Sequence, residues 1–170
     1  MKFKVTKKQN NGSKCFICGI HNAHGLKTKY YEIEGNRVLG VFKGDDLHQS
    51  FPGRMHGGIV AALLDETIGR ALQIDDPERW SVTFELTTKF LKPMPLEEEL
   101  YVVGWIDQVR HHIYFGQGYI CDQKGQVLAT ATGKYFEQNI REILVDKEDL
   151  GEEWIYVADE KMPLSFELPR

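Results

Sequence analysis

Long apolar runs are absent from this 170-residue sequence, and its first residues lack the pattern of a secretory leader. The chain has no uninterrupted apolar stretch of roughly 18 residues, which is the length that suggests a membrane-spanning helix. Its first residues, MKFKVTKKQNNGSK, contain neither the apolar stretch nor the small-residue cleavage site of a signal peptide. We therefore expect a soluble cytoplasmic protein that has no membrane partner.

An excess of basic residues is also missing. The 25 Asp and Glu residues outnumber the 21 Lys and Arg residues, and the formal net charge is -4. The cations are scattered along the chain, whereas proteins that bind a phosphate backbone gather them in a dense stripe. Nucleic acid is therefore not an expected partner.

Cysteine is scarce as well. The chain has three cysteines, Cys15, Cys18 and Cys121, which cannot all pair with one another. A reducing cytoplasm disfavours disulfide bonds further. The sequence therefore predicts a core that is held together without a disulfide framework.

The chain divides by composition into three parts, of which one has the patterns of a folded domain. Residues 1–25 mix Lys, Asn, Gly, Cys and His without periodicity, which predicts an irregular N-terminal segment. Residues 26–137 form the predicted domain. Residues 138–170 form an extension that either packs on the outside of this domain or stays partly mobile. Its acidic residues include Asp146, Glu148, Asp149, Glu152 and Glu153.

Within the predicted domain, the periodic patterns indicate two strands followed by one long helix. The β-rich runs of residues 26–42 surround the turn signal Gly35-Asn36, which predicts a hairpin. Apolar residues then recur at helical spacing over residues 56–74 and cover a wide arc, which predicts a buried helix. The sequence Asp75-Asp76-Pro77 ends this pattern, because proline cannot continue a helix.

Four further strands are expected after the helix. Residues 80–91, 100–109 and 112–137 are β-rich, and a turn at residues 122–125 divides the last segment into two strands. Their alternation of apolar and polar residues is typical of a sheet with one buried face. The order of elements predicts an α+β fold, with an antiparallel sheet wrapped around one long helix.

Two adjacent carboxylates lie in the middle of this buried helix. Asp65 and Glu66 directly follow the apolar segment at residues 61–64, and burying an ionised carboxylate is costly unless it is paired or functional. Successive residues of a helix are about 100° apart, so only one of the two can face the apolar side fully. Each of them is therefore either a structural acid with a partner or a catalytic group.

The start of the helix, His56-Gly57-Gly58, has features of a site for negative charge. The glycines leave backbone N–H groups unshielded at the positive end of the helix dipole, where an anion or a developing oxyanion can bind. Such a donor and a carboxylate about two turns away can flank one reacting group. A glycine pair before a helix is also compatible with simple close packing.

The segment HGGIVAALLDE, residues 56–66, resembles the HGG-x6-D signature of the hotdog-fold acyl-coenzyme A thioesterases of the phenylacetate-degradation type. The resemblance continues at residues 82–86 (VTFEL), 90–95 (FLKPMP) and 125–133 (GQVLATATG), and it covers roughly residues 15–137. It implies a hotdog fold, in which an antiparallel sheet wraps around a central helix. It also implies an enzyme that hydrolyses an acyl-coenzyme A thioester to a free acid and coenzyme A.

The resemblance implies roles for individual residues. Asp65 matches the acidic position of the signature and would act as general base toward water or as nucleophile on the thioester carbonyl. The amide of Gly57 would polarise that carbonyl, His56 and Gly58 would shape the turn, and Glu66 is the second candidate acid. Two protomers of this family pair their sheets edge to edge and share each active site, which implies a homodimer or homotetramer. No cofactor is expected.

Two positions depart from the family's pattern. Relatives often carry an Asn or Gln six residues before the histidine, where this chain has Ser50, with Gln49 one residue earlier. Either Gln49 or Ser50 is then the candidate that orients water or the thioester. Some relatives also carry a hydroxyl four residues after the acid, where this chain has Gly69.

Cations beside the strand ends are candidates for binding the phosphates of coenzyme A, because Arg and Lys both recognise phosphate groups. Arg110 and His111 are preferred, since their turn between two long strands resembles the coenzyme A contact region of relatives. The same charges are also typical of a solvated surface. The candidate substrate-binding residues are Thr83, Lys89, Lys92, Arg110, His111 and His112.

Four potential zinc ligands, Cys15, Cys18, His21 and His24, lie within residues 15–24. Structural zinc sites usually join two ligand pairs across a longer loop, so this crowding argues against a standard zinc finger. The CFICG segment also resembles an N-terminal element in a subgroup of these thioesterases. We interpret the cluster as packing and expect no metal, with a metal site as the alternative.

Two other functions compete with hydrolysis. A non-catalytic acyl-coenzyme A binding or sensing protein has the same fold, but regulators of that kind carry a DNA-binding helix pair that residues 1–25 cannot supply. Hotdog dehydratases need a catalytic histidine inside the helix region, whereas His56 lies at the helix start. The sequence therefore favours a thioesterase, and a binding protein is the alternative.

Overall fold

The computed structural model describes residues 1–145 and 150–169. Three acidic positions of the predicted extension, Asp146, Glu148 and Asp149, lie outside the described residues, as does Arg170. None of the helices in the described part of the chain has the length and apolar character needed to cross a membrane.

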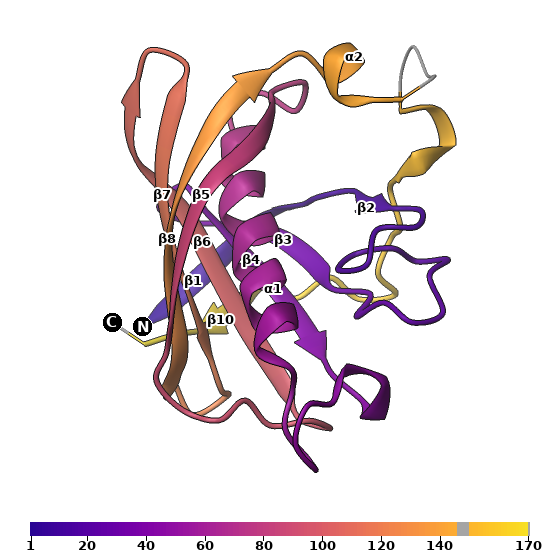
Figure 1. Cartoon of the computed structure of the whole chain (residues 1–170), viewed down its shortest axis with the longest axis vertical. Helices are drawn as coiled ribbons and strands as arrows, with labels where there is room; N and C mark the ends of the chain where they lie inside the picture. Colours follow the sequence, from indigo (N-terminus) through magenta and orange to yellow (C-terminus); the bar gives the residue numbers. More distant parts are fainter. Residues whose placement is uncertain (146–149, 170) are drawn as a thin grey trace.

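An antiparallel sheet, eight-stranded over the described residues, curls around helix α1, which spans Gly57–Arg70 (Figure 1). The order across the sheet is β10-β1-β3-β4-β6-β7-β8-β5. This arrangement confirms the predicted α+β fold. The strands of the sheet are β1 Lys2–Lys8, β3 Lys29–Ile33, β4 Arg37–Lys43, β5 Trp80–Phe90, β6 Glu99–Arg110, β7 Ile113–Cys121, β8 Val127–Gln138 and β10 Ser165–Glu167.

The predicted hairpin and the predicted helix are both present. The strands β3 and β4 pair across Gly35 and Asn36, whose φ angles of 83° and 52° suit glycine and asparagine. The helix α1 is followed by a 3₁₀ turn at Ala71–Gln73, so its α-helical part ends earlier than the pattern over residues 56–74 predicts. The chain nevertheless leaves the helix before Pro77, as expected.

The core lies between α1 and the sheet. Leu63, Leu64 and Ile68 of the helix are fully buried, and they belong to the same cluster as Val102 and Ile120 of the central strands. Neighbouring strand residues point to opposite faces. A second apolar cluster on the other face of the sheet therefore collects the alternate positions Tyr31, Leu39, Val103 and Cys121.

Glycines in β6 and β7 let the helix approach the sheet closely. A Cβ atom at Gly104 would lie 2.8 Å from both the backbone nitrogen of Ile68 and the carbonyl oxygen of Thr67. A Cβ atom at Gly118 would lie 3.0 Å from Cγ1 of Ile68. Because the nearest atoms at Gly104 belong to the helix backbone, they cannot move aside as a side chain can.

The expectation of an irregular segment over residues 1–25 is wrong for its first part. Residues Lys2–Lys8 form β1, which pairs antiparallel with β3. Phe3 and Val5 alternate with polar residues and pack on the second apolar cluster. Lysines fill most of the remaining positions of β1, so its short period-2 pattern is weak in the sequence.

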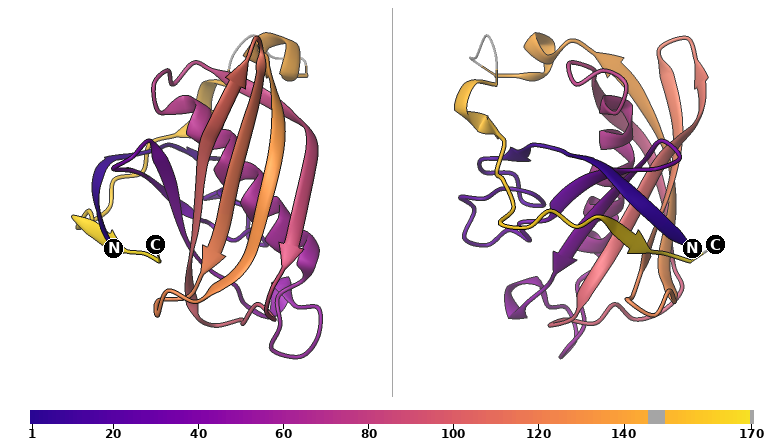
Figure 2. Two further views of the ribbon diagram at one scale, coloured as in Figure 1. Left: turned by 90° about the vertical axis from the view of Figure 1, so that its left-hand side faces the viewer. Right: turned by 180° about the vertical axis from the view of Figure 1, so that it is seen from behind.

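The C-terminal extension packs on the N-terminal residues. The short strands β2 (Asn11–Gly12) and β9 (Trp154–Ile155) pair with each other, and β10 pairs with β1. Figure 2 shows that these two ends of the chain run side by side. Lys8 Nζ lies 2.6 Å from Asp159 Oδ1, and Tyr31 donates a hydrogen bond to the same carboxylate. The short helix α2 (Ile140–Ile143) leads into the extension.

Strand β5 lies at one edge of the sheet, where it pairs with β8 alone within the described residues. The pairing register shifts between Thr83 and Glu85. This irregularity interrupts the alternation expected over residues 80–91, because Phe84 is 56% exposed while Val82 and Leu86 are partly buried. The outer edge of β5 therefore offers backbone groups and apolar rings to another chain.

We expect Gly104→Ala to lower the free energy of unfolding by about 1–3 kcal/mol, because the added methyl group collides with the helix backbone. Thermal and urea denaturation measure the change. Gln108→Ala, at the exposed end of the same strand, is the control and leaves the midpoint nearly unchanged. A Gly104→Ala protein as stable as the wild type would contradict the close packing of α1 on β6.

Candidate active site

The N-terminus of α1 presents a free backbone amide. His56 is the N-cap residue, and its Nδ1 accepts a hydrogen bond of 2.9 Å from the amide of Gly58. The amide of Gly57 has no acceptor among the described residues. Because a helix N-terminus carries partial positive charge, this amide is suited to bind an oxygen that bears negative charge.

Gly57 lines a cavity of about 400 Å³ together with Ser50 and Lys92. The two candidates for a group that orients the thioester, Gln49 and Ser50, differ in their position. The side chain of Gln49 is held within its own loop. Its Oε1 accepts a hydrogen bond of 2.9 Å from the amide of Gly53. Of the two residues, Ser50 is the one that lines this cavity.

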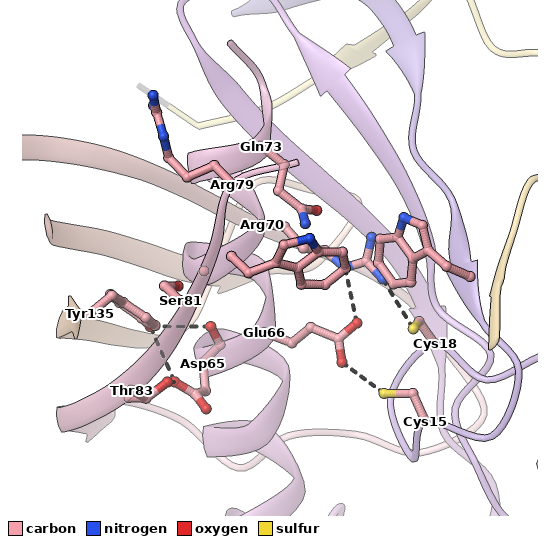
Figure 3. A pocket seen from close by; sticks show the side chains of 13 residues that line it. Cys15, Cys18, Asp65, Glu66, Arg70, Gln73, Arg79, Ser81, Thr83 and Tyr135 are labelled. Atoms are coloured by element: carbon pink, nitrogen blue, oxygen red, sulfur yellow. Dashed lines mark hydrogen bonds and ion pairs between the residues drawn. The ribbon is translucent and has the colours of Figure 1, made fainter. Parts of the chain in front are cut away.

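Asp65 lies about two turns further along α1, where two hydroxyl groups hold its carboxylate (Figure 3). Thr83 Oγ1, on β5, donates a hydrogen bond of 2.8 Å to Asp65 Oδ1. The hydroxyl of Tyr135, on β8, lies 3.2 Å from the same oxygen and 3.1 Å from the carbonyl oxygen of Asp65. Asp65 Oδ2 makes no hydrogen bond within the described residues and is therefore available to a ligand.

The surroundings of Asp65 alter its acidity. Burial raises the pKa of its carboxyl group above the ordinary value, although the hydrogen bonds from Thr83 and Tyr135 act in the opposite direction. Burial, together with the charge of Asp65, also raises the pKa of the Tyr135 phenol, so this residue stays protonated and remains a donor. A carboxylate with a raised pKa is a stronger base than an ordinary one.

Asp65 lines a second cavity, of about 320 Å³. Trp80 from β5 and Trp154 from β9 contribute to its wall, and their rings pack edge to face with centroids 5.2 Å apart. Gly69 lines the same cavity at the position where some relatives carry a hydroxyl. The C-terminal extension thus supplies part of the wall around the candidate catalytic acid.

Glu66 is turned away from Asp65 and forms an ion pair (Figure 3). Its Oε1 lies 2.9 Å from Nε of Arg70, a guanidinium that is 4% exposed. The Arg70 guanidinium also lies over the rings of Tyr30 and Trp154, at 4.1 and 4.7 Å from their centroids. These contacts give Glu66 a structural partner, whereas no cation pairs with Asp65 within the described residues.

The amide of Gly57 and the carboxylate of Asp65 do not meet within one chain. Eight residues separate them, which corresponds to about 12 Å along the helix axis. They also line different cavities. A single carbonyl group cannot contact both groups of the same protomer, because reacting atoms must approach to roughly 3–3.5 Å.

The predicted substrate-binding residues fall into separate groups. Thr83 contacts Asp65, and Lys92 lines the cavity at Gly57. Lys89 lies on β5 opposite Thr130 of β8. The turn residues Arg110, His111 and His112 lie at the other end of the sheet, beside Ile113, which pairs with Phe136. Along β8, Thr130 and Phe136 are six residues apart, so Lys89 lies roughly 20 Å from the turn that carries His111 and His112.

Three residues that line the cavity at Asp65, namely Arg79, Tyr135 and Trp154, are not among the candidates from the sequence. Tyr135 and Trp154 come from segments far from α1 in sequence, and only the fold brings them to it. Arg79 also lines the cavity, and its Nε lies 3.7 Å from Glu137. The sequence does contain one feature that indicates Tyr135: it is a tyrosine on a strand that also carries small residues, which leave room for its side chain to reach a helix. Nothing in the sequence indicates Trp154.

The cysteine and histidine cluster separates into two parts. Cys15 and Cys18 lie next to Glu66, whereas His21 Nδ1 lies 3.2 Å from Ser13 Oγ. His24 is exposed, and its carbonyl oxygen lies 3.0 Å from Nε2 of His48. The two histidines are therefore not arranged with the two sulfurs.

The comparison with protein families identifies the class of this fold. A sequence model of the thioesterase superfamily matches residues 52–129, a range that includes α1 with the whole HGG-x6-D segment and the strands β5 to β7. The sheet wrapped around α1 is the hotdog fold. The resemblance to the hotdog-fold thioesterase superfamily is therefore confirmed, while the phenylacetate-degradation type within it stays a prediction.

Solved structures agree with this assignment. A thioesterase superfamily protein is 27% identical over 72% of this chain, with a TM-score of 0.67, and this chain covers 59% of its length. A Bacillus halodurans protein crystallised with coenzyme A is 26% identical over 59% of this chain and 66% of its own length, with a TM-score of 0.54. A hypothetical thioesterase of Streptococcus pneumoniae, also with coenzyme A, shares the fold at 21% identity, with coverage of 61% and 82% and a TM-score of 0.56. Comparison with curated proteins gives no match.

The different environments of the two acids predict opposite effects on stability. Glu66→Gln leaves the buried charge of Arg70 without its ion-pair partner, so we expect the free energy of unfolding to fall by about 3 kcal/mol. Asp65→Asn relieves the burial of an unpaired charge and is expected to keep or raise stability. Urea denaturation of both variants measures the difference. Equal losses in the two variants would contradict these assignments.

Proposed function

We propose that this protein is an acyl-coenzyme A thioesterase that hydrolyses its substrate to a free acid and coenzyme A. The observation that carries the proposal is Asp65 itself. It occupies the acidic position of the HGG-x6-D signature, it has no cationic partner among the described residues, and it lines a cavity beside two hydroxyl donors. A half-buried acid with this environment is suited to chemistry, because a purely structural acid would be paired.

The proposed role of Asp65 is that of general base toward water or of nucleophile on the thioester carbonyl. Thr83 and Tyr135 both donate to Oδ1, which fixes the plane of the carboxylate and leaves Oδ2 for the reaction. Their hydrogen bonds also stabilise the ionised form against the effect of burial. In the first route, Asp65 takes a proton from water as the water attacks the carbonyl, and the tetrahedral intermediate expels the thiolate of coenzyme A to leave the free acid. In the second route, the carboxylate attacks, loss of the thiolate leaves a mixed anhydride on Asp65, and water then hydrolyses this anhydride to the free acid.

The proposed oxyanion donor is the amide of Gly57. Negative charge develops on the carbonyl oxygen during attack, and a free N–H at a helix N-terminus stabilises it. The imidazole of His56 supports this function, because it binds the next amide along the chain and leaves that of Gly57 free. Glu66 has no role in the proposed reaction, and Ser50 is the nearer candidate for orienting the thioester.

Gly57 and Asp65 of one chain are too far apart to contact the same thioester, but residues from the two chains of a homodimer can do so. We propose that each thioester lies between Gly57 of one protomer and Asp65 of its partner, as the family resemblance implies. The edge of β5, which no other described strand pairs, supports this arrangement, since β5 carries Thr83 and the exposed rings of Phe84 and Phe90. Phe90 also lies beside Gly57, so the same edge leads from one cavity to the other.

Coenzyme A binding by two neighbours with the same fold supports the choice of substrate. Lys92 lines the Gly57 cavity, whereas Arg110 and His111 lie at the far end of the sheet. In the proposed dimer, a second protomer brings the two groups to one coenzyme A site. The acyl group is assigned to the cavity at Asp65, where Trp80 and Trp154 offer an aromatic wall.

Asp65→Asn is expected to lower kcat by at least about 100-fold, because the amide keeps the size of the side chain but cannot accept a proton or attack a carbonyl. Release of coenzyme A thiol from short, medium, long and aryl acyl-coenzyme A substrates measures the effect and the acyl preference together. Asp107→Asn is the matched control, since this exposed aspartate on β6 lies outside both cavities.

Two results would contradict the proposed reaction. Full activity in a folded Asp65→Asn protein would exclude this carboxylate from the chemistry. Tight binding of acyl-coenzyme A without turnover of any substrate by the wild type would favour the non-catalytic binding protein.

Gly57→Pro removes the proposed donor while keeping the helix, since proline is favoured at the first helical position and His56 already has extended backbone with ψ of 133°. We expect kcat/KM to fall about 100- to 1000-fold, as on loss of one oxyanion donor. Circular dichroism checks that the fold persists.

Mixing the two inactive variants tests whether each site is shared. A mixed dimer contains one site with an intact Gly57 and an intact Asp65 from different chains, so random exchange restores about one quarter of the wild-type activity. If each site belonged to one chain, the mixture would stay inactive. Native mass spectrometry of an equimolar mixture, with one variant labelled with ¹⁵N, confirms that exchange has occurred between dimers.

A further inference from the structure

Three side chains with metal-ligating atoms converge beside α1, outside the proposed catalytic groups. The sulfur atoms of Cys15 and Cys18 and a carboxylate oxygen of Glu66 all lie within 4.8 Å of one another. Cys15 Sγ lies 3.0 Å from Glu66 Oε2 (Figure 3). The spacing of the cysteines and histidines did not indicate this group, because its third member comes from the helix.

Backbone amides hold both sulfurs in place. The amide of Gly12 lies 3.1 Å from Cys18 Sγ, and the amide of Ile17 lies 3.3 Å from Cys15 Sγ. The turn that carries both cysteines is closed by a hydrogen bond of 2.8 Å from the amide of Gly19 to the carbonyl oxygen of Cys15. Donors of this kind stabilise thiolates and orient them toward a metal.

The charges of the group match a divalent cation. Two thiolates and the Glu66 carboxylate carry three negative charges, and the buried Arg70 guanidinium supplies one positive charge to Glu66 and to Cys18 Sγ, at 2.9 and 3.0 Å. A divalent ion therefore brings the buried group to neutrality. Without the ion, neutrality requires that both sulfurs stay protonated.

We propose that Cys15, Cys18 and Glu66 form a binding site for zinc or a similar thiophilic divalent cation. Thiolate ligands favour such an ion over magnesium or calcium, and three protein ligands with one open position are typical of a tetrahedral zinc site that is not closed. The three residues line the cavity at Asp65, so the fourth position faces this cavity. Water or a polar group of a ligand occupies it.

The site joins two parts of the chain that the sheet does not hold together. Cys15 and Cys18 belong to the loop between β2 and β3, whereas Glu66 lies on α1 directly after Asp65. A bound ion fixes this loop as one wall of the Asp65 cavity. Metal binding is therefore expected to stabilise the fold, since the ion binds the native arrangement and not the unfolded chain.

The test is metal binding by the tag-free full-length protein under a reducing agent that does not bind metals. Protein treated with a chelator is titrated with Co²⁺, and visible absorption follows thiolate coordination. We expect about one ion per chain, displacement by Zn²⁺, and a rise in the melting temperature on binding. X-ray absorption of the zinc form should give two sulfur ligands at about 2.3 Å with oxygen ligands at about 2.0–2.2 Å.

Cys15→Ser and Cys18→Ser should each weaken binding by more than about 100-fold, beyond the effect of losing an outer-shell partner. Cys121→Ser and His24→Ala are the controls and should bind as the wild type does, because neither residue belongs to the group. The proposal is wrong if the reduced, folded protein gives no thiolate band. It is equally wrong if the band survives both cysteine variants, or if zinc shows only nitrogen and oxygen ligands. None of these measurements depends on thioesterase activity.

Discussion

The close packing of α1 against β6 fixes the direction in which each side chain of the helix points. With Gly104 facing the helix backbone at Thr67 and Ile68, the helix can neither rotate nor shift along the sheet without a collision. Asp65 and Glu66 are therefore held on two separate sides. Asp65 faces the hydroxyls of Thr83 and Tyr135, and Glu66 faces Arg70.

This separation gives two adjacent acids different chemistry. Arg70 neutralises the charge of Glu66 and is itself held between the rings of Tyr30 and Trp154. Glu66 is therefore a structural acid in a stable ion pair. Among the residues that the structure describes, the donors to Asp65 are the neutral hydroxyls of Thr83 and Tyr135, and burial raises its pKa. The N-terminal loop and the C-terminal extension complete the surroundings of both acids, because Cys15, Cys18 and Trp154 line the same cavity.

Local patterns predicted most of the fold and pointed to Asp65, the proposed catalytic acid. Helical spacing located α1, turn residues located the β3–β4 hairpin, and the unfavourable burial of an acid singled out Asp65 together with Glu66. The periodic pattern could not separate these two acids, and only the family resemblance favoured Asp65. Their different partners, Tyr135 and Arg70, become distinguishable only when the fold is known. Strand β1 was missed because lysines obscure its two apolar positions, and Trp154 was missed because its contact depends on a long-range pairing of short strands.

The most direct test of the account is a crystal structure of the Asp65→Asn protein with an acyl-coenzyme A analogue whose carbonyl is retained but whose sulfur–acyl bond cannot be hydrolysed. We expect a dimer in which the carbonyl oxygen accepts a hydrogen bond from the amide of Gly57 in one protomer. The carbonyl carbon should then lie beside position 65 of the partner subunit. A ligand bound entirely within one protomer, with its carbonyl remote from position 65, would contradict the account.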